Sequence, residues 1–319
     1  MERIVFLDEG TIGPGVHLGR PAFAHTWSGH QRTAPEDVVA RLEGASIAIT
    51  NKVPLTAETL AALPDLKFIA VAATGFNIVD IAACQSRGIP VSNIRGYAVN
   101  TVPEHTFALI LALRRNLIEY RQQVLDGAWV EADQFCFFNR PIRDLAGSTL
   151  GIIGAGALGQ SVGKIGRGFG MEVIYCDAYA PAAPDTGPLV SLETLRDTAD
   201  VVTLHCPLTD ETAGMIGADF LRKMKDSAIL INTARGGLID EPALAEAIQS
   251  GQIAGAGIDV TPVEPPPMNS TIMVLAAAPN VILSPHVAWA SVGGMQTLSD
   301  QLIGNIEAFV AGTPRNLVT

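Results

Sequence analysis

The sequence predicts an α/β protein built from two doubly wound parallel sheets. Short runs rich in β-branched residues alternate with helical stretches along the whole chain. This β-α-β order is typical of parallel sheets that helices cover on both faces. The chain has 319 residues and no long polar or low-complexity tract. Such a length suggests about two domains, each large enough to bury its own core.

The first β-α series lies near the start of the chain. Four short apolar runs indicate strands, at residues 3–8, 46–50, 67–71 and 89–93. Helical stretches separate them, at residues 35–44, 56–63 and 80–88. A long helical pattern follows at residues 101–129, and a loop-like segment at residues 130–147 comes after it. The series predicts the first of the two sheets.

A second β-α series follows this loop-like segment. Its expected strands lie at residues 148–154, 172–177, 201–206, 228–233, 255–260 and 281–286. The tail, residues 297–312, has helical periodicity. Because this helix comes after the second sheet is complete, it would be free to pack back on the first domain.

Composition argues against several classes of protein. The net charge of −11 disfavours a nucleic-acid or anionic-membrane surface, since both need clustered Lys and Arg. The mean hydropathy is +0.29, but no run of about 18 apolar residues occurs, so the apolar excess indicates buried strands. The N-terminus has too short an apolar core for a signal peptide. Four cysteines without a C-x-x-C pair predict free thiols in a reducing cytoplasm and no metal site.

A glycine pattern predicts a dinucleotide site. Gly154, Gly156 and Gly159 form G-x-G-x-x-G between an expected strand and an expected helix, as the mechanism requires. Gly154 would allow a tight turn, Gly156 would let the backbone approach the pyrophosphate, and Gly159 would let helix and strand pack closely. The free N–H groups of the helix N-terminus would bind the phosphates. The alternative to a dinucleotide site is a structural turn between strand and helix, in which the glycines have no role in binding.

The second strand of this unit ends at Asp177, 23 residues after Gly154. A carboxylate there can accept hydrogen bonds from both hydroxyls of the adenosine ribose and would repel a 2′-phosphate. No Arg or Lys occurs in the ten residues after Tyr179 to attract such a phosphate. The position therefore favours NAD over NADP.

Three further strand ends carry residues suited to hydride transfer to a keto acid. Such a reaction needs a cation for the substrate, an acid for its carbonyl oxygen, and a group that keeps this acid charged. Arg235, Glu264 and His286 follow successive expected strands, and ligands in open α/β sheets bind outside the carboxyl ends of the strands. Taken singly, they could be a surface ion pair, a solvated loop residue and a packed core histidine.

The motifs that contain these residues resemble a known family. They are GIIGAGALG, LHCPLTDET, MKDSAILINTARGGLIDEPAL, AGAGIDVTPVEPPP and VILSPHVAWAS. Together they resemble the NAD-dependent D-2-hydroxyacid dehydrogenases, and within them the glycerate dehydrogenases, also called hydroxypyruvate reductases. The resemblance covers nearly the whole chain. It implies a cytoplasmic oxidoreductase that uses NAD.

The resemblance also implies how the domains are built. A Rossmann NAD-binding domain, residues 99–291, would be inserted into a flavodoxin-like substrate domain made of residues 1–98 and 292–319. The helix from Thr101 and the aromatic loop at residues 134–140 would form a two-fold interface in a homodimer, with Phe137 or Phe138 near the partner's cleft. Ordinary burial within one subunit is the alternative.

The family pattern assigns roles to individual residues. Arg235 would bind and polarise the substrate, His286 would be the acid and base, and Glu264 would raise the pKa of His286. The segment AATGFN, which is followed by Ile78 where many members have a polar residue, would hold the substrate carboxylate near Thr74 and Gly75. Substrate-binding residues would thus be Thr74, Gly75, Arg235 and His286. Ala288 and Trp289 would wall the nicotinamide side, although a core role suits Trp289 equally. The expected cofactor-binding residues are Thr101, Gly154, Gly156, Ala157, Leu158, Gly159, Asp177, His205, Cys206, Pro207, Thr233, Ala234, Arg235, Asp259, His286 and Ala288.

The closeness to glycerate dehydrogenases favours a small substrate. Hydroxypyruvate or glyoxylate would be reduced to D-glycerate or glycolate. Alternatives within the enzyme class are a D-lactate-type enzyme, a D-3-phosphoglycerate enzyme and a broad 2-keto acid reductase. An alternative from another class is an NAD-sensing module that resembles a transcriptional co-repressor, but the complete set of Arg235, Glu264 and His286 argues against a purely structural role.

Overall fold

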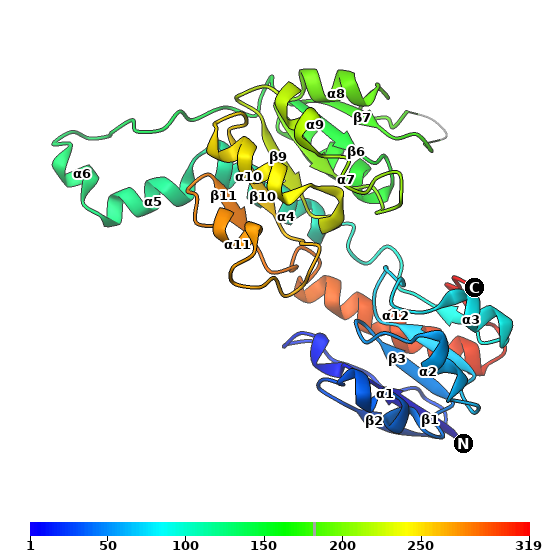
Figure 1. The fold of residues 1–319 in the computed structure, drawn as a ribbon. Coiled ribbons are helices and arrows are strands. Elements are labelled where there is room, and N and C mark those ends of the chain that lie inside the picture. The colour runs from blue at the N-terminus through cyan, green and yellow to red at the C-terminus, as the bar shows by residue number, and fades with distance from the viewer. Residues whose placement is uncertain (181–182) are drawn as a thin grey trace. The chain divides into compact units, whose positions relative to one another are not determined.

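The chain folds into two compact units. The structure is a computed structural model that describes residues 1–180 and 183–319. Unit 1 contains Met1–Tyr97 and Ala290–Thr319, and unit 2 contains Ala98–Trp289. Unit 1 is therefore made from both ends of the chain, and the chain passes between the units twice (Figure 1).

Unit 1 contains a five-stranded parallel sheet in the order β2-β1-β3-β4-β5, the flavodoxin-like arrangement. Its strands are β1 (Glu2–Phe6), β2 (His25–Gly29), β3 (Ile47–Thr50), β4 (Phe68–Val71) and β5 (Val91–Ser92). Its helices are η1 (Glu9–Thr11), η2 (Pro35–Asp37), α1 (Val38–Leu42), α2 (Ala57–Ala61), α3 (Ile81–Ser86) and α12 (Val292–Val310).

Helices cover both faces of the unit 1 sheet. Side chains of α1, α2 and α3, such as Leu42 and Leu60, share one core with the strands. On α12, Phe309 stacks on Phe68 of β4, with ring centroids 4.3 Å apart. The helical tail that comes after the second sheet thus packs on the first one.

Strand β2 was not predicted from the sequence. Its residues, HTWSG, include one β-branched residue, and none of them is fully buried. They form a strand because they pair with β1 at the edge of the sheet. Tertiary pairing decides such an edge strand, and local propensity does not.

Unit 2 contains a six-stranded parallel sheet in the order β11-β10-β9-β8-β6-β7. Its strands are β6 (Thr149–Ile153), β7 (Glu172–Cys176), β8 (Val201–Leu204), β9 (Ile229–Asn232), β10 (Gly255–Ile258) and β11 (Val281–Leu283). Its helices are α4 (Thr101–Arg114), α5 (Leu117–Leu125), α6 (Ala128–Glu131), α7 (Ala157–Gly168), α8 (Leu192–Thr198), α9 (Ala218–Lys223), η3 (Gly236–Leu238), α10 (Glu241–Gln249) and α11 (Thr271–Leu275).

The unit 2 sheet is doubly wound, as predicted. Buried side chains of α4 and α7, such as Phe107 and Val162, cover one face. Buried side chains of α8, α9, α10 and α11, such as Leu195 and Leu244, cover the other. The chain proceeds from β6 to β7 in one direction and from β8 to β11 in the other, so the topological switch point lies between β6 and β8. Doubly wound sheets bind their cofactor at this point, outside the carboxyl ends of the strands.

The helical pattern at residues 101–129 is not one continuous helix. It is divided into α4, α5 and α6 by Asn116, with φ of 50°, and Gly127, with φ of 91°. Both residue types tolerate this left-handed conformation, which ends an α-helix. The Asn116 side chain also donates a hydrogen bond to the Pro141 carbonyl. Figure 1 shows that α5 and α6 project from the rest of unit 2.

We name α5, α6 and the following loop to Ile142 the arm. It exposes large apolar side chains, among them Phe135, which is 90% exposed, and Phe138, which is 84% exposed. No helix in the described ranges is both long and apolar enough to cross a membrane.

Candidate active site

The register of three neighbouring strands brings the predicted catalytic residues to one edge of the unit 2 sheet. Ile258, the last residue of β10, is paired with Asn232 of β9 and with Leu283 of β11. The three strands therefore end level with one another, about 5 Å apart from strand to strand. The turns that follow them carry Arg235, Glu264 and His286.

Arg235 lies on a turn that the Asn232 side chain holds. The Asn232 amide donates to the Arg235 carbonyl at 2.9 Å and accepts from the Ala234 N–H at 3.0 Å. A side chain at Gly236 would collide with the backbone of Thr261, so this turn packs against the one that leads to Glu264. The guanidinium of Arg235 is exposed and has no carboxylate within ion-pair distance in the described part of the chain. It is available to an anionic ligand.

Glu264 and His286 form a close pair. The Glu264 Oε2 lies 2.6 Å from His286 Nδ1, and the Glu264 Oε1 accepts from the Thr261 N–H at 3.0 Å. An ionised carboxylate only accepts hydrogen bonds, so Nδ1 carries the proton in this contact. Nε2 has no partner among the residues that the structure describes and is left to react with a ligand.

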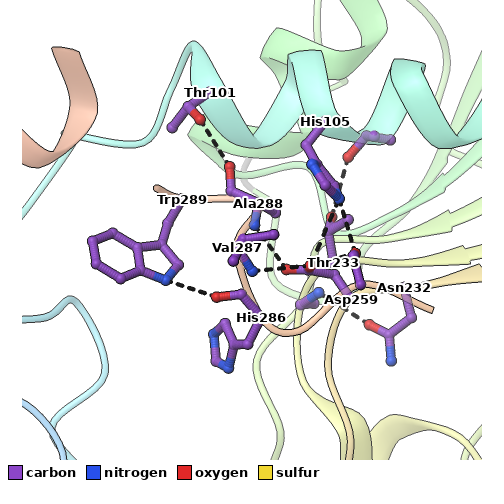
Figure 2. A network of polar contacts seen from close by, with 12 residues as sticks. Thr101, His105, Asn232, Thr233, Asp259, His286, Val287, Ala288 and Trp289 are labelled. Atoms are coloured by element: carbon purple, nitrogen blue, oxygen red, sulfur yellow. Dashed lines mark hydrogen bonds and ion pairs between the residues drawn. The ribbon is translucent and has the colours of Figure 1, made fainter. Parts of the chain in front are cut away.

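The turn that carries His286 is held by the carboxylate of Asp259. One oxygen accepts from the Val287 N–H at 3.0 Å, and the other accepts from the Ala288 N–H at 2.9 Å (Figure 2). The His286 N–H donates to the Asp259 carbonyl at 2.8 Å. Asp259 is 1% exposed. These contacts hold His286 at φ of 54°, a conformation that non-glycine residues rarely adopt.

Several predicted cofactor residues belong to this same network. The Thr101 hydroxyl of α4 donates to the Ala288 carbonyl at 2.8 Å, and Thr106 of α4 lies 3.1 Å from Thr233 across their hydroxyl oxygens. The Trp289 indole N–H donates to the His286 carbonyl at 2.9 Å, which braces the turn (Figure 2). Thr101, Thr233, Asp259 and Ala288 thus all make hydrogen bonds within the protein, beside the turn that carries His286.

The three glycines occupy the environments that their sequence pattern predicts. Gly154 has φ of 104°, and a β-carbon there would lie 2.6 Å from the His205 carbonyl oxygen. A β-carbon at Gly159 would collide with the Gly154 carbonyl oxygen, whereas one at Gly156 would meet open space. Gly156 is the N-cap residue of α7 and has no side chain to cap the helix, and Ala157 and Leu158 follow in the first turn. Open space in front of free helix N–H groups fits a pyrophosphate.

Asp177 lies against the same glycine turn. Its carboxylate accepts from the Ala155 N–H at 2.8 Å and from the Tyr179 N–H at 2.9 Å. The Tyr179 hydroxyl donates to Glu211 at 3.0 Å, and this carboxylate raises the pKa of Tyr179. Two carboxylates therefore stand at the end of β7, a poor environment for an additional phosphate.

The segment after β8 borders the same turn. Burial lowers the pKa of His205 to about 4, so its imidazole is neutral at physiological pH. Its Nε2 lies 2.9 Å from the Thr203 hydroxyl oxygen, and its buried Nδ1 has no partner in the described residues. Burial also raises the pKa of Cys206 to about 11, which keeps this thiol protonated. Pro207 follows and accepts a hydrogen bond from the Thr212 hydroxyl. The neutral surface, the unpaired nitrogen and the open glycine turn fit a dinucleotide.

The predicted substrate loop belongs to unit 1. It follows β4, where the Thr74 hydroxyl donates to the Ile94 carbonyl and the Asn93 amide donates to the Thr74 carbonyl, both at 2.8 Å. The backbone N–H groups of Thr74 and Gly75 have no partner among the described residues. Ile78, where the chain departs from the family pattern, accepts a backbone hydrogen bond from Leu55 at 2.8 Å, which supports the end of the loop.

Metal-ligating side chains do not gather in the described ranges. They contain no group of three or more His, Cys, Asp or Glu residues placed to hold a metal ion. All four cysteines are free thiols.

Comparison with known proteins identifies the family. Residues 107–288 match the family model described as D-isomer specific 2-hydroxyacid dehydrogenase, NAD binding domain. Over 318 residues, which are 99% of each chain, the protein is 53% identical to the glycerate dehydrogenase of Methylorubrum extorquens. The chain belongs to the D-isomer specific 2-hydroxyacid dehydrogenase family.

Two further proteins are similar to this D-2-hydroxyacid dehydrogenase. The hydroxypyruvate reductase of Blautia hydrogenotrophica is 38% identical over 288 residues, which are 90% of this chain and 88% of that protein. The structure of the D-lactate dehydrogenase of Aquifex aeolicus, complexed with NAD and lactic acid, has a TM-score of 0.81 at 28% identity and covers 97% of this chain and 96% of that one. The protein is an NAD-dependent oxidoreductase, which confirms the predicted family, fold class and cofactor.

The residues predicted from the sequence do not include His105 or Ser284. His105 of α4 contacts Ser284, and Ser284 contacts Asp259. A signal was present, because His105 follows Thr101 by four residues and therefore lies on the same face of the helix.

Two alanine substitutions should separate the binding and packing roles of the glycine turn. Gly156→Ala places its methyl group in open space, so the melting temperature should not change, but NADH should bind at least about tenfold more weakly. Gly159→Ala should instead destabilise the protein by about 1–3 kcal/mol, because its methyl group has no room. Calorimetric melting and NADH titration of both variants measure these effects. Normal NADH binding by Gly156→Ala would contradict the assignment of the pyrophosphate site.

Proposed function

We propose that this dehydrogenase uses NADH to reduce a small 2-keto acid, hydroxypyruvate or glyoxylate, to D-glycerate or glycolate. The observation that carries the proposal is the Glu264–His286 pair, with 2.6 Å between the carboxylate and Nδ1 and Nε2 left for a ligand. The exposed Arg235 on the neighbouring strand end provides the cation for an acidic substrate. The similarity to proteins named glycerate dehydrogenase and hydroxypyruvate reductase supports the choice of substrate.

The chain supplies the groups that bind the substrate and move the proton. NADH, when bound, supplies the hydride. Arg235 binds the substrate carboxylate and polarises the carbonyl with its two-pronged guanidinium. His286 donates the proton on Nε2 to the carbonyl oxygen, and in the reverse direction it accepts the proton from the hydroxyl group.

Glu264 acts through His286. Its negative charge at Nδ1 stabilises the imidazolium that the reduction requires and orients the ring so that Nε2 is presented to the substrate. The Thr261 N–H fixes the other carboxylate oxygen, so the charge is held in one place. Glu264 is therefore a positioning and charge partner, and His286 is the group that transfers the proton.

The same geometry supports a choice of cofactor form. We assign Asp177 as the acceptor for the ribose hydroxyls of NAD, because its carboxylate lies against the glycine turn. The neighbouring Glu211, held by Tyr179, adds a second negative charge there. A 2′-phosphate would be repelled by both.

A panel of 2-keto acids tests the substrate. NADH oxidation, followed at 340 nm, should be most efficient with hydroxypyruvate and glyoxylate, measured as kcat/KM. Pyruvate belongs in the panel because the similar structure from Aquifex aeolicus is of a D-lactate dehydrogenase. A clear preference for pyruvate, phosphohydroxypyruvate or a bulky keto acid would replace the proposed substrate. No turnover of any member would favour a binding module that only senses NAD.

Arg235→Lys provides the control for this panel. An ammonium keeps the charge but cannot bind carboxylate and carbonyl oxygen together. The variant should lose at least about a hundredfold in kcat/KM for every keto acid, equivalent to about 2.7 kcal/mol, while its affinity for NADH falls much less. Near-normal turnover would remove Arg235 from the site.

The pH dependence tests the role of Glu264. Reduction requires protonated His286 and fails as pH rises, whereas oxidation requires neutral His286 and fails as pH falls. Glu264→Gln keeps the shape but removes the charge that favours the protonated ring. The pH at which each reaction fails should therefore be lower in the variant, because a nearby negative charge that favours the imidazolium is gone. Profiles of log(kcat/KM) against pH for both proteins in both directions measure the shift. If reduction and oxidation fail at the same pH in the variant as in the native protein, Glu264 is excluded as the charge partner.

We infer that the arm forms a two-fold dimer interface. Its exposed apolar side chains, including Leu125, Val130, Phe135 and Phe138, are more than an isolated surface segment normally presents. Phe137 packs edge-on against Tyr120 within the arm, with centroids 5.5 Å apart, so Phe138 is the better candidate to reach a partner.

Sedimentation at micromolar concentration should find a dimer. The double variant Phe135→Ser/Phe138→Ser should dissociate, because it removes the two most exposed aromatic rings from the interface. Phe309→Leu, a change in unit 1 and not in the arm, is the control and should stay dimeric. A monomeric native protein would refute the inference.

A further inference from the structure

We propose that His105 is a positioning residue for the reaction: it holds the turn that carries His286 through a relay from His105 to Ser284 to Asp259. The proposal rests on the role of His286 given above. His105 itself contacts the relay and is not assigned to the substrate or the proton that the substrate receives.

Helix α4 contacts the turn that carries His286 at two points. Thr101 donates to the Ala288 carbonyl at 2.8 Å, and His105 Nε2 lies 3.0 Å from the Ser284 hydroxyl oxygen. Residues four apart lie on one face of a helix, so both side chains reach the same turn. Ser284 and Ala288 flank His286 by two residues on either side. Figure 2 shows Thr101 and His105 pointing from α4 toward this turn.

The hydrogen-bond directions form one consistent chain. The Ser284 hydroxyl lies 2.5 Å from Asp259 Oδ1, and a buried carboxylate that accepts backbone N–H groups is an acceptor only. Ser284 therefore uses its single hydroxyl proton on Asp259. His105 must then donate its Nε2 proton to the Ser284 oxygen, which assigns its tautomer. The relay ends on the oxygen that also accepts the Val287 N–H.

This relay matters because the turn is strained. His286 has φ of 54°, and a non-glycine residue keeps such a conformation only when its surroundings overdetermine it. Without the His105 proton, only the hydrogen bond to Asp259 fixes the Ser284 side chain. One of the three donors to the carboxylate near the turn is then less firmly placed, and the position of His286 becomes less well defined. A misplacement of about 1 Å can cost about a hundredfold in rate.

Two substitutions of matched chemistry test the donor. In His105→Gln the amide nitrogen reaches the place of Nε2, whereas in His105→Asn the shorter side chain does not. His105→Asn should lower kcat by about ten- to a hundredfold with little change in the dissociation constant of NADH. His105→Gln should recover most of kcat. An equal loss in both variants, or no loss in His105→Asn, would overturn the proposal.

A double-mutant cycle tests the relay itself. Ser284→Ala should reproduce the loss of kcat, and combining it with His105→Asn should add nothing further, because both substitutions break one chain. Fully additive losses would show separate roles and refute the relay. Weaker NADH binding in proportion to the lost kcat would assign His105 to the cofactor instead.

A measurement without substrate keeps this test distinct from the test of function. The N–H groups of Val287 and Ala288 donate hydrogen bonds to Asp259. Their amide hydrogens should exchange with solvent at least about tenfold faster in His105→Asn than in the native protein or in His105→Gln. This result is expected even if the native protein reduces no keto acid, an outcome that would refute only the proposed function. Unchanged exchange would refute the relay.

Discussion

The candidate active site of this dehydrogenase depends on the hydrogen bonds of one buried carboxylate, that of Asp259. A charge that is 1% exposed is costly unless hydrogen bonds compensate it. Asp259 meets this requirement with the N–H groups of Val287 and Ala288 and the hydroxyl of Ser284. The compensation has a structural consequence, because all three donors belong to the turn around His286. The contacts that satisfy this buried charge are therefore also the contacts that place His286, the proposed acid–base residue.

The parallel sheet supplies the second constraint. Because β9, β10 and β11 end in register, the turns after them lie side by side, although their residues are far apart in the sequence. Each turn then needs only local support. Asn232 holds the turn of Arg235, Thr261 holds the carboxylate of Glu264, and Asp259 holds the turn of His286. A cation, a carboxylate and an imidazole are thereby presented at one edge, which is the arrangement that keto acid reduction requires.

The ends of β6 and β7, at the other end of the same sheet, have the features of a cofactor site. The physical requirement there is different. At the glycine turn, function needs the absence of side chains. Gly154 permits the turn beside His205, Gly159 permits the contact between α7 and β6, and Gly156 leaves free space. Burial keeps His205 neutral and Cys206 protonated, so this surface adds no charge of its own. The charges stand instead at the end of β7, where Asp177 and Glu211 are placed.

The sequence by itself determined the features that depend on short-range pattern. The alternation of strands and helices predicted both parallel sheets, and the spacing of Gly154, Gly156, Gly159 and Asp177 predicted the NAD site, because each of these acts through its local backbone. Tertiary structure alone decided the rest. Strand β2 exists because β1 pairs with it, and the predicted helix at residues 101–129 breaks where Asn116 and Gly127 adopt left-handed conformations. The spacing of Thr101 and His105 was visible in the sequence, but the contact of His105 with Ser284 was hidden. The two residues are 179 residues apart and meet only because α4 packs beside β11. A contact between residues so distant in sequence leaves no local periodicity, so only the folded chain reveals it.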